Sequence, residues 1–174
     1  MISSVADPLK TVTLNAGDFH FGSGHTRIST LLGSCISITL WHPHQRIGGM
    51  CHYMLAERHV SRDGLSRPVL DGRYADDAFA LFLQHMAEAG TRPGEYQAKL
   101  FGGGNMFNSG GDPKGIGSRN VERGRELLTV NNITLTAEHV GGNGRRKLHF
   151  DLNSGHVWLA FPEGSNAYIR NAYG

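Results

Sequence analysis

Alternating apolar and polar positions divide the chain into short strands with two helical stretches between them. TVTLN (11–15) alternates and predicts a short strand, after which glycine and histidine break the pattern. Residues 28–40 and IGGMCHYML (47–55) also have strand character, and the turn WHPHQR (41–46) joins them. The pattern therefore predicts a β-hairpin in the first third of the chain.

Two segments in the middle of the chain repeat their apolar residues at helical spacing. The stretch 73–90 is the clearest helix, and Gly90 is placed to end it. Its apolar stripe, which we assign to core packing, consists of Ala75, Ala78, Phe79, Phe82 and Met86. A second helix is predicted from about Gly117 to Asn131, with Ser118 as its N-cap.

Strands follow again towards the C-terminus. YQAKLF (96–101) predicts one strand, and three more, joined by GGNGRR and NSG, predict a meander over 133–140, 147–152 and 156–161. Strands at both ends with two helices between them favour a single layered α+β domain. We expect a flexible N-terminal segment over 1–11, the domain over 12–161 and a C-terminal tail over 162–174.

Composition narrows the function classes. At 174 residues the chain has the length of one domain. Its net charge is only +2 and its basic residues are scattered, so we expect no nucleic-acid partner. The N-terminus MISSVADPLK lacks the apolar run of a signal peptide, and no window approaches the ~18 apolar residues of a membrane span. We therefore expect a cytoplasmic monomer without membrane insertion, whose two cysteines stay reduced.

Ten histidines invite a metal hypothesis. No C-x-x-C, H-E-x-x-H or similar ligand spacing supports it, so we expect neither a metal nor another cofactor. The glycine-rich FGGGNMF is not followed by Lys-Ser or Lys-Thr, which disfavours a phosphate-binding loop and favours a tight turn near a site. The polar segment 58–73 predicts a long loop bordering that site.

The hairpin brings a cysteine and a histidine together. With a four-residue loop over 42–45, Trp41 faces Arg46, and Cys35 then lies directly opposite His52 on the polar face. Directly opposed Cβ atoms are about 4.5–5.5 Å apart, within reach of a thiol–imidazole hydrogen bond. A bulge at the glycines 48–49 would move His52 to the wrong face.

The other cysteine has a different environment in this register. Cys51 falls on the apolar face with Ile36, Ile38 and Leu40, and we interpret it as a small buried hydrophobe. It also points away from Cys35, so a disulfide between them is disfavoured.

A paired thiol and imidazole can form a nucleophilic site. The imidazole of His52 removes the proton of Cys35, and the resulting imidazolium lowers the thiol pKa. Gly33 permits a close backbone approach, and the amides of Ser34 or Cys35 are candidates to hold an oxyanion. A hydroxyl just upstream, that of Ser29 or Thr30, could orient the histidine.

These residues resemble a known family. LLGSCISITLWHP followed by IGGMCHYML resembles the CheD family of chemoreceptor glutamine deamidases, in which an LGSC cysteine precedes by seventeen residues a histidine in A-H-x-x-L-P. Cys35 and His52 have this spacing. The family's remaining blocks resemble, in order, GRYADDAF, KLFGGGNMF, IGSRNVE and AEHVGGNGRRKLHFDLNSGHV, so the resemblance covers about residues 12–161.

The resemblance implies an α/β/β layered sandwich and a thiol amidohydrolase. Cys35 would attack the side-chain amide of glutamines on methyl-accepting chemotaxis receptors, and His52 would act as base and then as acid. The family's third catalytic residue is a threonine six positions before the cysteine. Here that position is Ser29, which keeps the hydroxyl but lacks the methyl group, and Thr30 is the alternative.

Two other interpretations remain open. The resemblance also implies another role, because CheD-like proteins of some organisms bind a CheC-type phosphatase, so the chain could be a non-catalytic interaction module. In GGNGRR, Arg145 and Arg146 could face an acidic partner, although solvated turn charges are the simpler interpretation. A thiol redox sensor ranks last, because Cys51 is poorly placed to resolve an oxidised Cys35.

Overall fold

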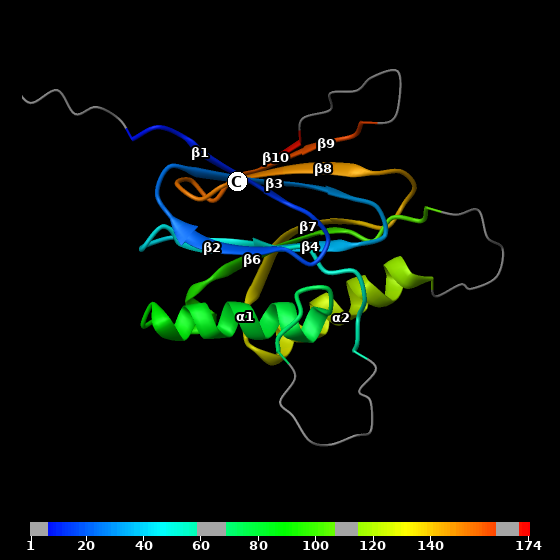
Figure 1. Cartoon of the computed structure of the whole chain (residues 1–174), viewed down its shortest axis with the longest axis horizontal. Coiled ribbons are helices and arrows are strands. Elements are labelled where there is room, and N and C mark those ends of the chain that lie inside the picture. Colours follow the sequence, from blue (N-terminus) through cyan, green and yellow to red (C-terminus); the bar gives the residue numbers. More distant parts are fainter. Residues whose placement is uncertain (1–6, 59–68, 107–114, 163–170) are drawn as a thin grey trace, which may run out of the picture.

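The fold has three layers in the computed structural model, which describes residues 7–58, 69–106, 115–162 and 171–174. Two helices cover one face of a five-stranded sheet, and a second five-stranded sheet covers its other face (Figure 1). We call these the central sheet and the outer sheet. The expected α/β/β sandwich is thereby confirmed. No helix in the described ranges is both long enough and apolar enough to cross a bilayer.

The central sheet has the strand order β2-β5-β4-β6-β7. Its strands are β2 (Phe19–Ser23), β4 (Ile36–His42), β5 (Ile47–Cys51), β6 (Gln97–Gly102) and β7 (Thr134–Val140). The outer sheet has the order β1-β3-β8-β9-β10. Its strands are β1 (Lys10–Leu14), β3 (Thr26–Leu32), β8 (Arg146–Asp151), β9 (Val157–Ala160) and β10 (Asn171–Tyr173). The predictions omitted β2 and β10.

The helices lie close to their predicted positions. Helix α1 (Ala75–Glu88) buries the five predicted stripe residues, and Gly90 follows it with φ 68°. Helix α2 (Ile116–Val130) connects the parallel strands β6 and β7, and a short 3₁₀ helix (Pro93–Glu95) precedes β6. The N-cap of α2 is Gly115, not Ser118, which lies within the first turn.

The predicted strand 28–40 is wrong as a single element. It is divided into β3 and β4, which belong to different sheets. Residues 33–35, here called the crossing segment, carry the chain from one sheet to the other. The predicted meander is likewise divided, because β7 belongs to the central sheet while β8 and β9 belong to the outer one. Strand alternation identifies faces, but it does not identify the sheet.

The terminal assignments fall partly outside the description. In the expected N-terminal segment 1–11, residues 1–6 are not described, and β1 already begins at Lys10. In the expected tail 162–174, residues 163–170 are not described. Its last residues form β10, which pairs with β9 in antiparallel fashion.

Candidate functional site

Cys35 lies at the end of the crossing segment, directly before β4. It is half-buried and packs against the core between the two sheets. Its carbonyl accepts the amide of Gly103 at 3.0 Å. Gly102 has φ 111°, and a Cβ there would lie 2.1 Å from the Cys35 carbonyl oxygen. The GGG turn is therefore glycine-rich because its backbone lies directly against the crossing segment.

The register between β4 and β5 differs from the prediction by two residues. His42 pairs with Ile47, and an isolated bridge pairs Ile36 with Tyr53. The turn begins one residue later than predicted, because Arg46 has φ 51° and donates its amide to His42.

A shift of two residues preserves the strand face. Cys35 and His52 therefore share a face as predicted, but they are diagonal neighbours rather than directly opposed. Diagonal residues are separated by about 7–8 Å, and the two side chains form no hydrogen bond with each other. The predicted environment also needs correction, because this face packs against the outer sheet.

Two elements fix the position of His52, which is 5% exposed. Its backbone carbonyl accepts the amide of Gly17 at 2.7 Å, and its amide donates to the carbonyl of Asp18 at 3.2 Å. Its ring Nδ1 lies 2.7 Å from Oγ1 of Thr30 on β3. The loop between β1 and β2 therefore holds the backbone, while the outer sheet holds the ring.

The hydroxyl beside the imidazole belongs to Thr30, not to Ser29. Thr30 is buried on the inner face of β3, whereas Ser29 faces the opposite way and lies 3.4 Å from Oγ1 of Thr13. The alternation of Ile28, Thr30 and Leu32 could have predicted this, because the two apolar neighbours mark the inner face of the strand.

The Thr30 hydroxyl also determines the tautomer of His52. Its single proton is donated to the carbonyl of Leu14 at 2.8 Å, so the oxygen can only accept from the imidazole. Nδ1 of His52 therefore carries the proton, and Nε2 keeps its lone pair. Among the described residues, Nε2 has no hydrogen-bond partner. It is available to take a proton.

The site rests in its neutral form. Burial lowers the pKa of His52 to about 4, although the Asp18 carboxylate acts in the opposite direction. Burial also raises the pKa of the Cys35 thiol. The low thiol pKa expected from the pairing is therefore wrong for this resting structure. A thiol and a neutral imidazole suit proton transfer during attack, rather than a preformed ion pair.

Cys51 has the predicted environment. It is 1% exposed within the core that also contains Ile36, Ile38 and Leu40. Burial raises its thiol pKa to about 12. The two cysteines are both free, and they lie on opposite faces of the central sheet.

The crossing segment presents two amides that bond no other residue in the part of the chain that the structure describes. These are the N–H groups of Ser34 and Cys35. The carbonyls of Gly33 and Cys35 are bonded by the amides of Gly104 and Gly103, at 2.9 and 3.0 Å. The predicted oxyanion donors thus lie on a segment in which the neighbouring turn holds two of the three carbonyls.

Arg146 is not the surface residue that one interpretation required. It is 2% exposed, and its guanidinium binds Nδ1 of His139 and the carbonyls of Gly102 and Gly141. It therefore braces the glycine turn that touches the crossing segment. Arg145 is exposed.

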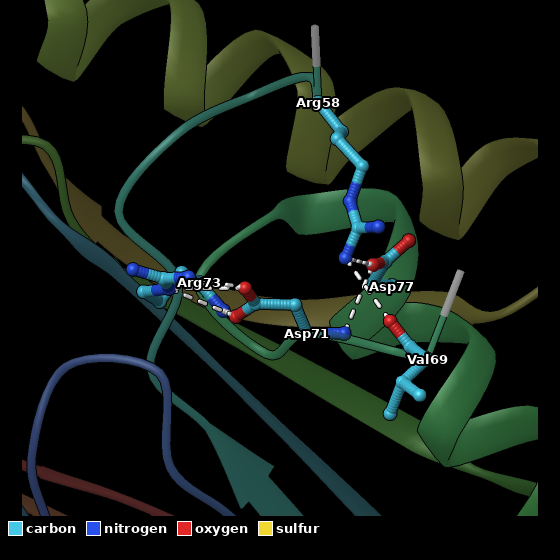
Figure 2. A network of polar contacts seen from close by, with 5 residues as sticks. All are labelled: Arg58, Val69, Asp71, Arg73 and Asp77. Carbon is cyan, nitrogen blue, oxygen red and sulfur yellow. Dashed lines mark hydrogen bonds and ion pairs between the residues drawn. The ribbon is translucent and has the colours of Figure 1, made fainter. Parts of the chain in front are cut away.

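A polar network holds the described ends of the predicted loop 58–73 (Figure 2). Arg58 donates to the carbonyl of Val69 at 3.1 Å and pairs with Asp77 at 2.9 Å. Asp77 accepts the amide of Asp71, whose carboxylate pairs with Arg73 at 2.6 Å. Residues 59–68 of this loop lie outside the description.

The same network supports the chain directly after His52. The carbonyl of Arg73 accepts the amides of Met54 and Leu55 at 2.8 and 3.1 Å. The described ends of the loop therefore border the histidine strand, as predicted.

Four exposed apolar side chains lie beside the crossing segment or in the cavity next to α2, and we call them the apolar rim. It consists of Met54, Leu55, Met106 and Ile116, which are 38–50% exposed. Met106 lies against Gly33, and Met54 is the residue opposite Cys35 in the extended β4–β5 register. Leu55 and Ile116 line a cavity of about 470 Å³ beside α2, whose lining also contains the charged residues Glu57, Arg119, Glu122, Arg123 and Glu126. Exposed apolar side chains grouped near Cys35 favour a macromolecular ligand.

Comparisons with known proteins agree with the resemblance seen in the sequence. The family model "CheD chemotactic sensory transduction" matches residues 54–161, which begin two residues after His52. A probable chemoreceptor glutamine deamidase CheD 3 of Dechloromonas aromatica is 63% identical over 99% of this chain and all of that protein. A protein of the same kind from Chromobacterium violaceum is 45% identical, over 90% of this chain and 81% of the relative.

Proposed function

We propose that this chain, which belongs to the CheD family, is a chemoreceptor glutamine deamidase that acts through Cys35 and His52. Its relatives are named as probable enzymes of this kind. The single observation that carries the mechanism is the bond between Thr30 and Nδ1 of His52, because it leaves Nε2 as a base on the face that carries Cys35.

The first half of the reaction transfers the acyl group to the thiol. Nε2 of His52 takes the proton of Cys35 while Sγ attacks the carboxamide carbon of a receptor glutamine. The developing oxyanion is stabilised by the amides of Ser34 and Cys35. The C–N bond then breaks, and the imidazolium gives its proton to the departing ammonia. A glutamyl thioester remains.

Water completes the reaction. His52 removes a proton from a water molecule, which attacks the thioester carbonyl. The C–S bond breaks, Cys35 regains its proton, and the product is a glutamate side chain. No step requires a metal or an organic cofactor. The reaction requires a reduced thiol, so we place it in the cytoplasm. We take the chain to act as a monomer.

The apolar rim supports a protein substrate. A small-molecule amidase would need an enclosed pocket, whereas exposed methionine, leucine and isoleucine side chains suit the surface of a folded partner. The same rim would equally suit a CheC-type phosphatase, so a binding role is the second candidate.

The test incubates a chemoreceptor cytoplasmic domain with the wild type, with Cys35→Ala, and with Cys51→Ala as the matched control. Mass spectrometry should find selected glutamines converted to glutamate by the wild type and by Cys51→Ala, but not by Cys35→Ala. If all three leave the receptor unchanged while the wild type binds a CheC-type phosphatase, the interaction module is correct and the deamidase is not.

A further inference from the structure

Asn120 on α2 is connected to both segments that carry the candidate catalytic pair. It is 1% exposed, and its side-chain nitrogen donates to the carbonyl of Ser34 at 3.2 Å and to that of Met54 at 2.7 Å. An amide nitrogen has two protons, so both are used. Ser34 directly precedes Cys35, and Met54 is two residues after His52.

Helix α2 is itself held against this point. The backbone carbonyl of Asn120 accepts the hydroxyl of Tyr53 at 2.6 Å. One turn later, a Cβ at Gly124 would lie 2.6 Å from that hydroxyl, so the helix approaches Tyr53 as closely as a glycine allows. Tyr53 exchanges two backbone hydrogen bonds with Ile36, the residue after Cys35. Asn120 therefore has a fixed position relative to both strands.

The bond to Ser34 has a specific consequence for the neighbouring amide. In a trans peptide the carbonyl of one residue and the N–H of the next point in opposite directions within one plane. The carbonyl of Ser34 and the N–H of Cys35 belong to the same plane. Holding that carbonyl towards α2 therefore directs the Cys35 N–H away from α2.

Each carbonyl of the crossing segment accepts a hydrogen bond from another element. The amide of Gly104 binds the carbonyl of Gly33, and the amide of Gly103 binds that of Cys35. The Ser34 carbonyl, in the middle, is held by the side chain of Asn120. Within the described chain this is the one carbonyl of the three that depends on a side chain, so its plane can be released by a substitution.

We propose that Asn120 is a positioning residue that orients the Cys35 amide as an oxyanion donor. The inference rests on the proposed thiol chemistry, but it does not require that a receptor be the substrate. It predicts that loss of Asn120 slows reactions that pass through an oxyanion and spares reactions of the same thiol that do not.

Two small reagents make this distinction. p-Nitrophenyl acetate acylates Cys35 through a tetrahedral oxyanion, forming the C–S bond and releasing p-nitrophenolate. Iodoacetamide alkylates the same sulfur by displacing iodide, without an oxyanion. Asn120→Ala should slow acylation about tenfold and change alkylation less than about twofold, because one misdirected oxyanion donor costs more than a change in thiol environment. With the receptor, kcat should fall and KM should stay constant.

Two variants serve as controls. Asn131→Ala removes another side-chain amide of the same helix, one that binds the carbonyl of Leu127, and should leave both rates unchanged. Asn120→Ser introduces no charge and keeps one hydroxyl proton for at most one of the two carbonyls, so it tests the same point should Asn120→Ala fail to fold.

The ratio of the two rates decides the outcome. If acylation and alkylation fall together in both Asn120 variants, or if neither changes, the positioning role is wrong. Failure of the wild type to deamidate a receptor would overturn the proposed function but would leave this ratio measurable. A change confined to KM would likewise contradict the inference.

Discussion

The two faces of the central sheet differ in what they bury. The face against the helices is mostly apolar, although it also buries His42; its apolar residues include Ile36, Ile38, Leu40, Cys51, Ala98 and Leu100. The face against the outer sheet also contains buried polar groups: Ser37, Thr39, His52 and Lys99. Strand alternation sends neighbouring residues of the same strands to these two environments.

The difference shows which face of the central sheet can bury polar, reactive side chains. Polar groups inside a protein need partners, and the outer sheet supplies them for His52 and Lys99. The hydroxyl of Thr30 is hydrogen-bonded to His52, and the carbonyls of Gly155 and Tyr173 accept hydrogen bonds from the Lys99 amine at 2.7 and 2.9 Å. On the other face, Cys51 is enclosed by mainly apolar side chains, so its thiol is inert there.

The largest expected effect separates the two cysteines. At pH 8 in the native state, iodoacetamide should label Cys35 at least about a thousandfold faster than Cys51, because Cys51 is enclosed and its pKa is about 12. Peptide mapping after timed quenching measures both rates. Comparable native-state rates would mean that the two faces do not differ as described.

The second effect is a displaced pH dependence. An imidazole with an ordinary pKa of 6.5 would reduce kcat/KM roughly thirtyfold at pH 5. With the pKa of His52 at about 4, we expect almost full activity at pH 5 and an acid limb near pH 4. An acid limb near 6.5 in the rate profile would contradict the buried neutral histidine.

The same group links folding to pH. The folded pKa of His52 lies below the unfolded value, so the unfolded chain binds the proton first as pH falls. The contribution of neutral His52 to the free energy of unfolding is therefore complete above pH 6.5, and it decreases as the pH falls towards 4. The free energies of unfolding of the wild type and of His52→Gln, measured with urea, should approach each other as the pH falls from 6.5 to 4. The difference between the two proteins isolates His52, because His20 and His139, whose pKa values are also lowered, are present in both.

The sequence predicted the strand face of each residue better than it predicted which strands pair with one another. Alternation placed Cys35 and His52 on one face and Cys51 on the other, and a register error of two residues left this intact. It failed at residues 33–35, because apolar strand residues continue on both sides of the crossing. Nothing in a strand's periodicity reports which sheet it joins.

The residues that orient the site were harder to predict. Thr30 was an alternative to Ser29, and the inner-face pattern of β3 could have decided between them. Asn120 has no local signal, because its partners Ser34 and Met54 are 86 and 66 residues away in the chain. Such contacts depend on tertiary packing.

The third prediction compares neighbouring hydroxyls of β3. Thr30→Val removes the hydrogen bond to His52 but keeps the branched shape, and should lower kcat about tenfold, the equivalent of ~1.4 kcal/mol. Thr30→Ser should retain most of the activity. Ser29→Ala, on the opposite face, should have almost no effect. If Ser29→Ala were the damaging change, the assignment of Thr30 would be wrong.

The fourth prediction concerns Lys99. Burial lowers its pKa to about 8, and its amine binds the carbonyls of Gly155 and Tyr173. Lys99→Met removes both bonds but also removes a buried charge, so the net loss of unfolding free energy should be about 1 kcal/mol. Hydrogen exchange should accelerate at β10, which this lysine ties to the central sheet. Unchanged protection there would show that the strand does not depend on Lys99.

The smallest effect is expected at Ser37. Its hydroxyl is fully buried without a hydrogen-bond partner among the described residues, and in the extended register Ser37 lies opposite His52. An unpaired buried hydroxyl costs free energy, so Ser37→Ala should raise the free energy of unfolding by up to about 1 kcal/mol. The matched change Thr30→Val should lower it, because that hydroxyl is paired. A destabilised Ser37→Ala protein would mean that the hydroxyl has a partner, and a parallel loss of kcat would identify that partner as the thiol–imidazole pair.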